Sequence, residues 1–175
     1  MRNGISAGPL PQIWLPFAAE ISQACVDATF GAVRTFSPLV AYAVKVNETG
    51  SSTDPAEIQG GADPNTLLMP DGSNAGRGIF QLTSSWPPNW QKPYANALYA
   101  LENPGFLMEA EQYWVQQGYV GEALVKLIAA SFNAGIGGAQ VGHDQGNCDL
   151  NTTDNYGARA VAHYQALFAG RSPFS

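Results

Sequence analysis

The placement of glycine and proline constrains the fold of this chain more than any other feature of its sequence. The chain has 19 glycines and 12 prolines, and many of them lie in residues 50–93 and 134–146. Proline removes a backbone donor and glycine weakens regular elements, so such stretches favour turns. The sequence therefore predicts short helices joined by long, shaped loops. Binding and catalytic residues are enriched in loops of this kind.

Between these stretches, apolar residues recur at helical spacing. One helix is expected to begin at Ser37-Pro38, an N-cap followed by proline at the first helical position, and to end near Glu48. The other helices are expected at residues 12–34, 93–101, 104–117, 121–133 and 155–168. Short strands are expected within residues 50–76 and at 78–82. The pattern predicts an α+β fold that is mainly α.

Size, composition and charge narrow the classes of function. A chain of 175 residues fits a single domain, 1–175, and its 45% of apolar residues suffice for one core. A formal net charge of -6 with only eight Lys and Arg argues against a nucleic-acid binder. No run approaches the roughly 18 consecutive apolar residues of a membrane helix. We therefore expect a monomer that neither binds nucleic acid nor inserts into a membrane.

The N-terminal 25 residues do not have the pattern of a signal peptide, because Pro11, Pro16 and Glu20 interrupt their apolar run. Cys25 and Cys148 lack C-x-x-C spacing. Two buried thiols and one long-range disulfide both fit that pair.

Metal-dependent chemistry has little support in the sequence. His143 and His163 are the only histidines, and no H-E-x-x-H motif occurs. This argues against a zinc peptidase or amidase. We expect no metal and no cofactor.

Glu48 is the strongest candidate for a catalytic residue. It ends a largely apolar helix just before a polar loop. The helix dipole disfavours a negative charge at that end, so the carboxyl pKa should be raised. A carboxyl that stays protonated near neutral pH can serve as the general acid of a glycosidase. The alternative is a solvated glutamate at a helix end.

Three further segments carry groups suited to a sugar ligand. Residues 76–83 read GRGIFQLT, in which two glycines let the backbone approach a ligand and Gln81 offers a donor and an acceptor. In SFNAG, Asn133 could bond an N-acetyl group, and Tyr156 opens the last helix. Taken singly, these are also compatible with a glycine-rich hairpin, a helix stop and a core tyrosine.

Taken in order, the four segments resemble the goose-type lysozyme and lytic transglycosylase superfamily, including phage-encoded members. The order is Glu48, then GRGIFQL, then SFNAG, then D-x-x-T-T-x-x-Y-G over residues 149–157. The family segments read roughly E-S or E-T, G-x-G-L-M-Q, A-Y-N-A-G and a late tyrosine. The resemblance covers about residues 38–168, and residues 1–36 lie outside it. It implies a lysozyme-like fold with a small β-hairpin or short sheet beside the active-site cleft.

The resemblance also implies roles for individual residues. Glu48 would be the general acid that protonates the glycosidic oxygen of bacterial peptidoglycan, and Tyr156 would lie close to it. Gln81 and Asn133 would hold the substrate. The backbone around Ile79 and Phe80 would line the cleft.

Two positions depart from the family pattern. Phe132 replaces the tyrosine of A-Y-N-A-G, and Thr83 stands where goose-type enzymes commonly have an aspartate. Asp71 is the remaining candidate for a second carboxylate, although it also fits a turn residue in D-G-S-N.

Three functions follow as hypotheses. The first is a lytic transglycosylase that forms 1,6-anhydro-muramic acid. The others are a hydrolysing muramidase with Asp71 as its base and a non-catalytic module that binds peptidoglycan or chitin. The resemblance suggests a phage endolysin or virion-associated lysin acting in the host periplasm or cell wall, or a secreted mature bacterial enzyme. Its partner would be the glycan strand.

Overall fold

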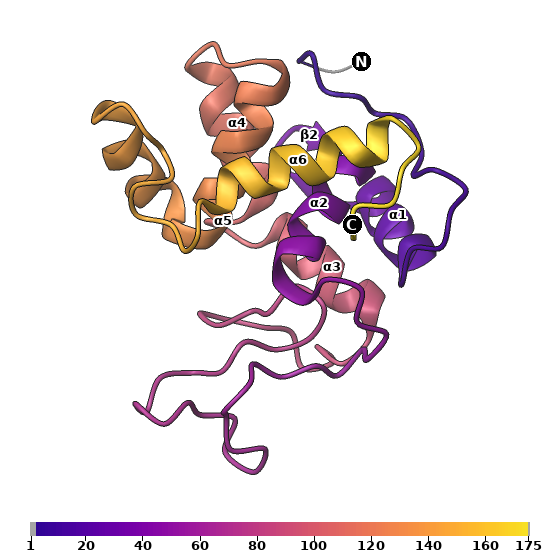
Figure 1. The fold of residues 1–175 in the computed structure, drawn as a ribbon, viewed down its shortest axis with the longest axis vertical. Coiled ribbons are helices and arrows are strands. Elements are labelled where there is room, and N and C mark those ends of the chain that lie inside the picture. The colour runs from indigo at the N-terminus through magenta and orange to yellow at the C-terminus, as the bar shows by residue number, and fades with distance from the viewer. Residues whose placement is uncertain (1–2, 175) are drawn as a thin grey trace.

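Six helices and one two-stranded sheet form the regular structure of residues 3–174, which are the residues that the computed structural model describes (Figure 1). Residues 1, 2 and 175 of the expected domain lie outside them. In chain order the elements are α1 (Ala18–Asp27), β1 (Thr29–Phe30), β2 (Val33–Arg34), α2 (Pro38–Thr49), α3 (Pro93–Glu102), α4 (Leu107–Gln116), α5 (Gly121–Asp144) and α6 (Tyr156–Phe168). The prediction of a mainly helical α+β chain is confirmed.

Helix α2 is the central helix, and it begins as predicted. The side chain of Ser37 accepts a hydrogen bond from the backbone N–H of Val40 (3.4 Å), and Pro38 occupies the first turn. Every residue from Pro38 to Val46 is buried, so α2 is covered on all sides. Helix α6 packs against both α2 and α5 and crosses the helical body in Figure 1. This packing brings the end of α2 close to the start of α6.

Helix α5 extends beyond its predicted end. Gly135 leaves the helical conformation (φ 74°, ψ 157°), as the predicted stop requires, but helical turns resume at once and continue to Asp144. A left-handed glycine therefore produces a kink here instead of a terminus. By length and composition α5 could cross a membrane. Because α5 packs between α4 and α6, burial in a protein core accounts for the same composition.

The prediction of one long helix over residues 12–34 is wrong. Helix α1 ends at Asp27, and the chain then forms the antiparallel pair β1–β2, in which Thr29 lies opposite Arg34. Gly31 has a left-handed φ of 57°, which lets the chain reverse between the strands. This hairpin contacts α3 and α4.

Residues 50–92 form a separate lobe of turns, here called the loop lobe, which extends below the helical body in Figure 1. The strand expected at residues 78–82 is absent, because these residues form a turn closed by a single bridge between Arg77 and Leu82. The guanidinium of Arg77 donates to the carbonyl of Ala75 (2.9 Å). It also stacks on Trp86, 3.5 Å from the ring centre. Isolated backbone bridges, such as those between Ile58 and Arg77 and between Asp63 and Leu68, and side-chain contacts of this kind organise the lobe in place of a continuous sheet.

Candidate active site

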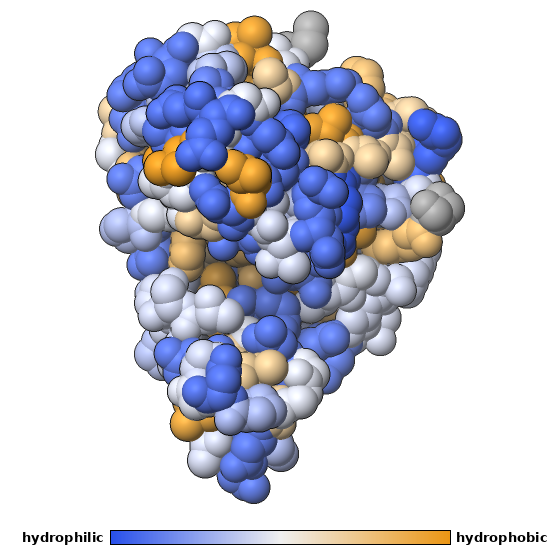
Figure 2. Space-filling view, turned by 60° about the vertical axis from the view of Figure 1, so that its left-hand side comes forward, coloured by the Kyte–Doolittle hydropathy of each residue, from blue (hydrophilic) through white to orange (hydrophobic). Residues whose placement is uncertain are grey.

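A cavity of about 270 Å³ lies where the helical body meets the loop lobe. Figure 2 shows the surface hollowed between the broad upper part of the molecule and its narrow lower end. The helical body contributes residues of α2 and α5 and the residue before α4, and the loop lobe contributes the other face. The lining residues are Glu48, Gln59, Gln81, Leu82, Thr83, Phe106, Phe132 and Asn133. Glu48 is the one ionisable side chain among them.

Glu48 occupies the last turn of α2, where the phenolic hydroxyl of Tyr156 donates a hydrogen bond to its Oε1. Burial raises the pKa of this carboxyl to about 7. The hydrogen bond from Tyr156 and the positive charge of Arg159 oppose the rise. The upward direction agrees with the sequence-based expectation, although burial is the main cause. A carboxyl with this pKa holds its proton in a large fraction of molecules at neutral pH.

Tyr156 is held by its backbone as well as by its ring environment. The side-chain amide of Asn47 donates to the Tyr156 carbonyl (2.8 Å), linking α2 to the start of α6. The ring is buried, and burial raises the pKa of the phenol well above its ordinary value. The hydroxyl therefore stays protonated and acts as a donor to Glu48.

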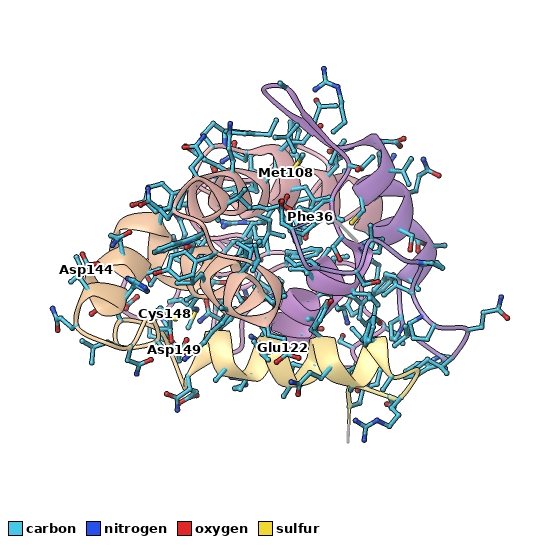
Figure 3. All side chains as sticks on the ribbon, turned by 90° about the horizontal axis from the view of Figure 1, so that it is seen from above. Phe36, Met108, Glu122, Asp144, Cys148 and Asp149 are labelled. Carbon is cyan, nitrogen blue, oxygen red and sulfur yellow. The ribbon has the colours of Figure 1, made fainter. Side chains whose placement is uncertain are left out.

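Asp149 fixes the N-terminus of α6 (Figure 3). Its Oδ1 accepts from the backbone N–H of Gly157 (2.6 Å), and its Oδ2 accepts from that of Ala158 (3.1 Å). Lys126 from α5 lies 3.3 Å from Oδ2. A carboxylate at this position accepts hydrogen bonds from free backbone N–H groups, and its negative charge interacts favourably with the positive end of the helix dipole. The sequence singled out Asp149 as part of a motif but did not reveal this capping role.

The backbone of Gln81 adopts a left-handed φ of 45° inside the turn, so this residue does not lie on a strand. Its side-chain amide nitrogen donates to the carbonyl of Gly78 (2.9 Å). A Cβ on Gly76 would lie 2.7 Å from Oε1 of Gln81. The first glycine of the predicted segment therefore makes room for the Gln81 side chain beside the cavity.

Ile79 and Phe80 do not line the cavity. Both side chains are fully buried in the core. The hydroxyl of Thr49 donates to the Ile79 carbonyl (3.1 Å), and the Phe80 N–H donates to Oδ1 of Asn96 (2.9 Å). The two residues anchor the wall of the cavity from behind.

Asn96 is a structural residue that the sequence analysis missed. It is fully buried in α3, and its side-chain nitrogen donates to the carbonyl of Arg77 (3.1 Å). A Cβ on Gly78 would lie 2.3 Å from that nitrogen, which explains the second glycine of the segment. A lone asparagine in the apolar run PYANALYALE is the signal that could have revealed it.

Lys45 is a second missed residue. It is fully buried one turn before Glu48, and its Nζ donates to the carbonyl of Gly50 (2.7 Å). Burial lowers its pKa to about 8, and the charge of Glu57 opposes the shift. Lys45 thus ties the start of the loop lobe to the helix that carries Glu48.

Asn133 and Phe132 lie on the opposite wall. Asn133 is exposed just before the kink at Gly135, and its Oδ1 accepts from the backbone N–H of Thr153 (3.0 Å). The Phe132 ring packs against that of Phe106 at 5.5 Å between centres. The cavity therefore has an aromatic, apolar wall at Phe106 and Phe132.

Asp71 does not join the other predicted residues in the cavity. It is exposed in a turn of the loop lobe, where its Oδ1 accepts from the Ser73 N–H (2.9 Å) and hydroxyl (2.6 Å). These bonds lower its pKa. It lines a neighbouring hollow of about 450 Å³ instead. The structure thus brings together Glu48, Gln81, Asn133 and, through its hydroxyl, Tyr156.

A small β-hairpin or short sheet was expected beside this cleft, and no residue of the β1–β2 hairpin lines the cavity. Cys25 and Cys148 are both buried free thiols. Within residues 3–174, no group of three or more His, Cys, Asp or Glu side chains is placed to hold a metal ion. Comparisons with protein-family models, curated proteins and solved structures find no match to this chain.

Proposed function

We propose that this protein cleaves the β-1,4 bond between N-acetylmuramic acid and N-acetylglucosamine in bacterial peptidoglycan, with Glu48 as general acid and base. The observation that carries the proposal is a carboxyl with a pKa of about 7 in a cavity whose lining has no other ionisable group. Glycosidases use such a protonated carboxyl to transfer a proton to the leaving oxygen. The order of the sequence motifs supplies the substrate class.

The proposed reaction is a lytic transglycosylation. Glu48 gives its proton to the glycosidic oxygen as the bond from the muramic acid C1 breaks. The C6 hydroxyl of the same muramic acid then attacks C1, and the Glu48 carboxylate takes the hydroxyl proton. The products are a 1,6-anhydro-muramic acid end and a free 4-hydroxyl, so no water is consumed. The tethered hydroxyl acts at a high effective concentration.

The absence of a second carboxylate from the cavity lining supports this route over hydrolysis. An inverting hydrolase needs a carboxylate about 6.5–9.5 Å from the acid to activate water. Thr83, which lines the cavity, cannot take that role. Asp71 belongs to the neighbouring hollow, and the turn bonds from Ser73 already occupy its Oδ1.

The remaining lining groups suit an N-acetylated sugar. Gln81 and Asn133 provide carboxamides at the two walls, and Gln59 provides a third from the loop lobe. Phe106 and Phe132 give an apolar surface on which a sugar ring or an acetyl methyl can pack. We assign substrate holding to these five residues.

We further propose that the architecture is lysozyme-like, with α2 carrying the acid and the loop lobe closing one side of the cleft. The partner is the peptidoglycan strand, and the protein acts as a monomer. A phage-encoded lysin acting in the host periplasm or wall fits this proposal, as does a secreted bacterial enzyme.

Clearing of a suspension of purified cell walls tests the proposal. We expect the wild-type protein to clear the suspension and Glu48→Gln to lose at least about 100-fold of the rate, since general acid catalysis contributes 10²–10⁴-fold. The variant should still sediment with walls, because the carboxamide keeps the shape of the site. Binding without clearing by the wild type would identify a non-catalytic module. A Glu48→Gln rate within about tenfold of the wild type would exclude Glu48 as the acid.

A further inference from the structure

We propose that the hollow beside the Glu48 cavity binds a primary ammonium group carried by the wall polymer, and that Asp71 is the residue that recognises it. This inference rests on the proposed function and extends it. It gives Asp71 a role in choosing the substrate in place of the role of catalytic base that the sequence left open.

The hollow adjoins the catalytic cavity. Gln59 and Thr83 line both, so one strand can occupy the two spaces at once. Its volume of about 450 Å³ exceeds the 270 Å³ of the cavity itself. A polymer that places one bond at Glu48 therefore places a neighbouring unit, or its side branch, at Asp71.

The lining of the hollow is mostly polar and carries a single charge. The residues are Gln59, Met69, Asp71, Ser73, Asn74, Thr83 and Ser84. Asp71 is the only charged group, and no lysine or arginine is among them to neutralise it. A polar, solvent-accessible hollow with a single negative charge favours a cationic ligand over a neutral or anionic one.

The carboxylate of Asp71 is oriented and half free. Both bonds from Ser73 end on Oδ1, and they fix the side chain within its turn. Neither bond from Ser73 occupies Oδ2. The same two bonds lower the pKa of Asp71, so the group stays ionised at neutral pH. An ammonium that donates to Oδ2 would complete the site.

Wall polymers carry primary amines in two places. One is a free amino group on a stem peptide, and the other is a glucosamine that lacks its acetyl group. Both present the same –NH₃⁺ chemistry to Asp71. The two sources differ in whether removal of the peptides abolishes the effect, so the experiment can separate them.

The test measures binding of soluble glycan fragments to the Glu48→Gln protein, which cannot consume them. We expect acetylation of the fragment amines to raise the Kd about threefold, in line with the modest strength of exposed ion pairs. Adding Asp71→Asn should abolish this difference. An equal Kd for native and acetylated fragments, or a difference that persists in Asp71→Asn, would overturn the inference.

Asp63 supplies a matched control. It is an equally exposed aspartate of the same lobe, and its Oδ1 accepts from the Asn65 N–H (2.8 Å) as Asp71 accepts from Ser73. It does not line the hollow. Asp63→Asn should therefore leave the threefold difference unchanged. Loss of the difference in this variant would show that general lobe charge, rather than Asp71, is responsible and would overturn the inference.

Peptide-free strands identify the source of the amine. If only partially de-N-acetylated strands show the Asp71-dependent gain, the ammonium is on the sugar; if only peptide-bearing fragments show it, the ammonium is on the stem. Either result supports the site. Failure of the proposed function looks different, since the wild type would then bind the fragments without cutting them. A loss of all cleavage in Asp71→Asn at unchanged Kd would mark Asp71 as a base and contradict the inference.

Discussion

The hydroxyl of Tyr156 donates a hydrogen bond to the carboxyl of Glu48, joining two helices whose contacting residues are 108 positions apart in the sequence. The bond opposes the effect of burial on the carboxyl. Burial raises the pKa of Glu48, and the tyrosine hydrogen bond lowers it, with about 7 as the result. The pair therefore sets the pH range over which Glu48 can act as an acid.

The first prediction concerns the pH dependence of wall cleavage. Only the protonated carboxyl can deliver a proton, so kcat/KM should fall about tenfold per pH unit above a pKa of about 7. Initial rates on purified walls between pH 5 and 9 measure this limb. A rate that stays constant to pH 9 would mean that Glu48 is not the acid.

The second prediction concerns stability. The folded-state pKa of about 7 exceeds the ordinary value of 4.5, so folding favours the protonated form. The contribution of Glu48 to stability should therefore fall as the pH rises from 4.5 to 7, by about 2–3 kcal/mol. Glu48→Gln lacks this loss and should be the more stable protein above pH 7, while the two match near pH 4. Urea unfolding at pH 4 and pH 8 measures the difference; a constant difference would contradict the burial of the carboxyl.

The third prediction isolates the hydrogen bond between the two helices. Tyr156→Phe keeps the buried ring but removes the donor that lowers the Glu48 pKa. The alkaline limb of the pH profile should move to higher pH. The maximal rate should fall, because the negative charge that develops on Glu48 as it gives up its proton loses a hydrogen-bond donor. Tyr164→Phe is the control, since its hydroxyl accepts from Ser6 far from the cavity. An unshifted limb in Tyr156→Phe would show that the hydroxyl does not influence Glu48.

Local start and stop signals predicted α2, α3, α4 and α6 well, whereas the helix expected at residues 12–34 was wrong. Ser37 and Pro38 mark the beginning of α2, and Gly135 leaves the helical conformation where a stop was expected. The sequence pattern could not show that α5 continues beyond Gly135, because that continuation depends on packing against α4 and α6. The hairpin after α1 was missed because one glycine, Gly31, reverses the chain inside an otherwise helical pattern.

The sequence predicted the polar residues of the site but not the buried residues that hold them in place. The order of the four segments, and no single residue, pointed to Glu48, Gln81 and Asn133, and all three line one cavity. The backbone around Ile79 and Phe80 was expected to line it, but neither residue is in the lining and both side chains pack in the core. Support by buried partners such as Asn96 depends on contacts far apart in the chain, which local pattern does not encode.

The fourth prediction concerns the cap of α6. Asp149→Ala leaves two backbone donors without their acceptor, so unfolding free energy should fall by about 2–4 kcal/mol. The start of α6 should also loosen, weakening the contact between Tyr156 and Glu48. The pH limb should therefore move toward that of Tyr156→Phe in the folded variant. Asp154→Asn, an exposed change in the same connection, should alter neither the stability nor the alkaline limb of the pH profile. If the limb of Asp149→Ala matches that of the wild type, Asp149 contributes to stability alone.

The last prediction concerns the product of the reaction. With Glu48 as the only ionisable group lining the cavity, the tethered C6 hydroxyl should attack in place of water. Mass spectrometry of digested walls should then show muropeptides lighter by one water, the mark of a 1,6-anhydro ring. Asp71→Asn should leave the product ratio unchanged, because Asp71 lies in the neighbouring hollow. Reducing-end muramic acid as the main product, suppressed in Asp71→Asn, would instead establish hydrolysis with Asp71 as the base.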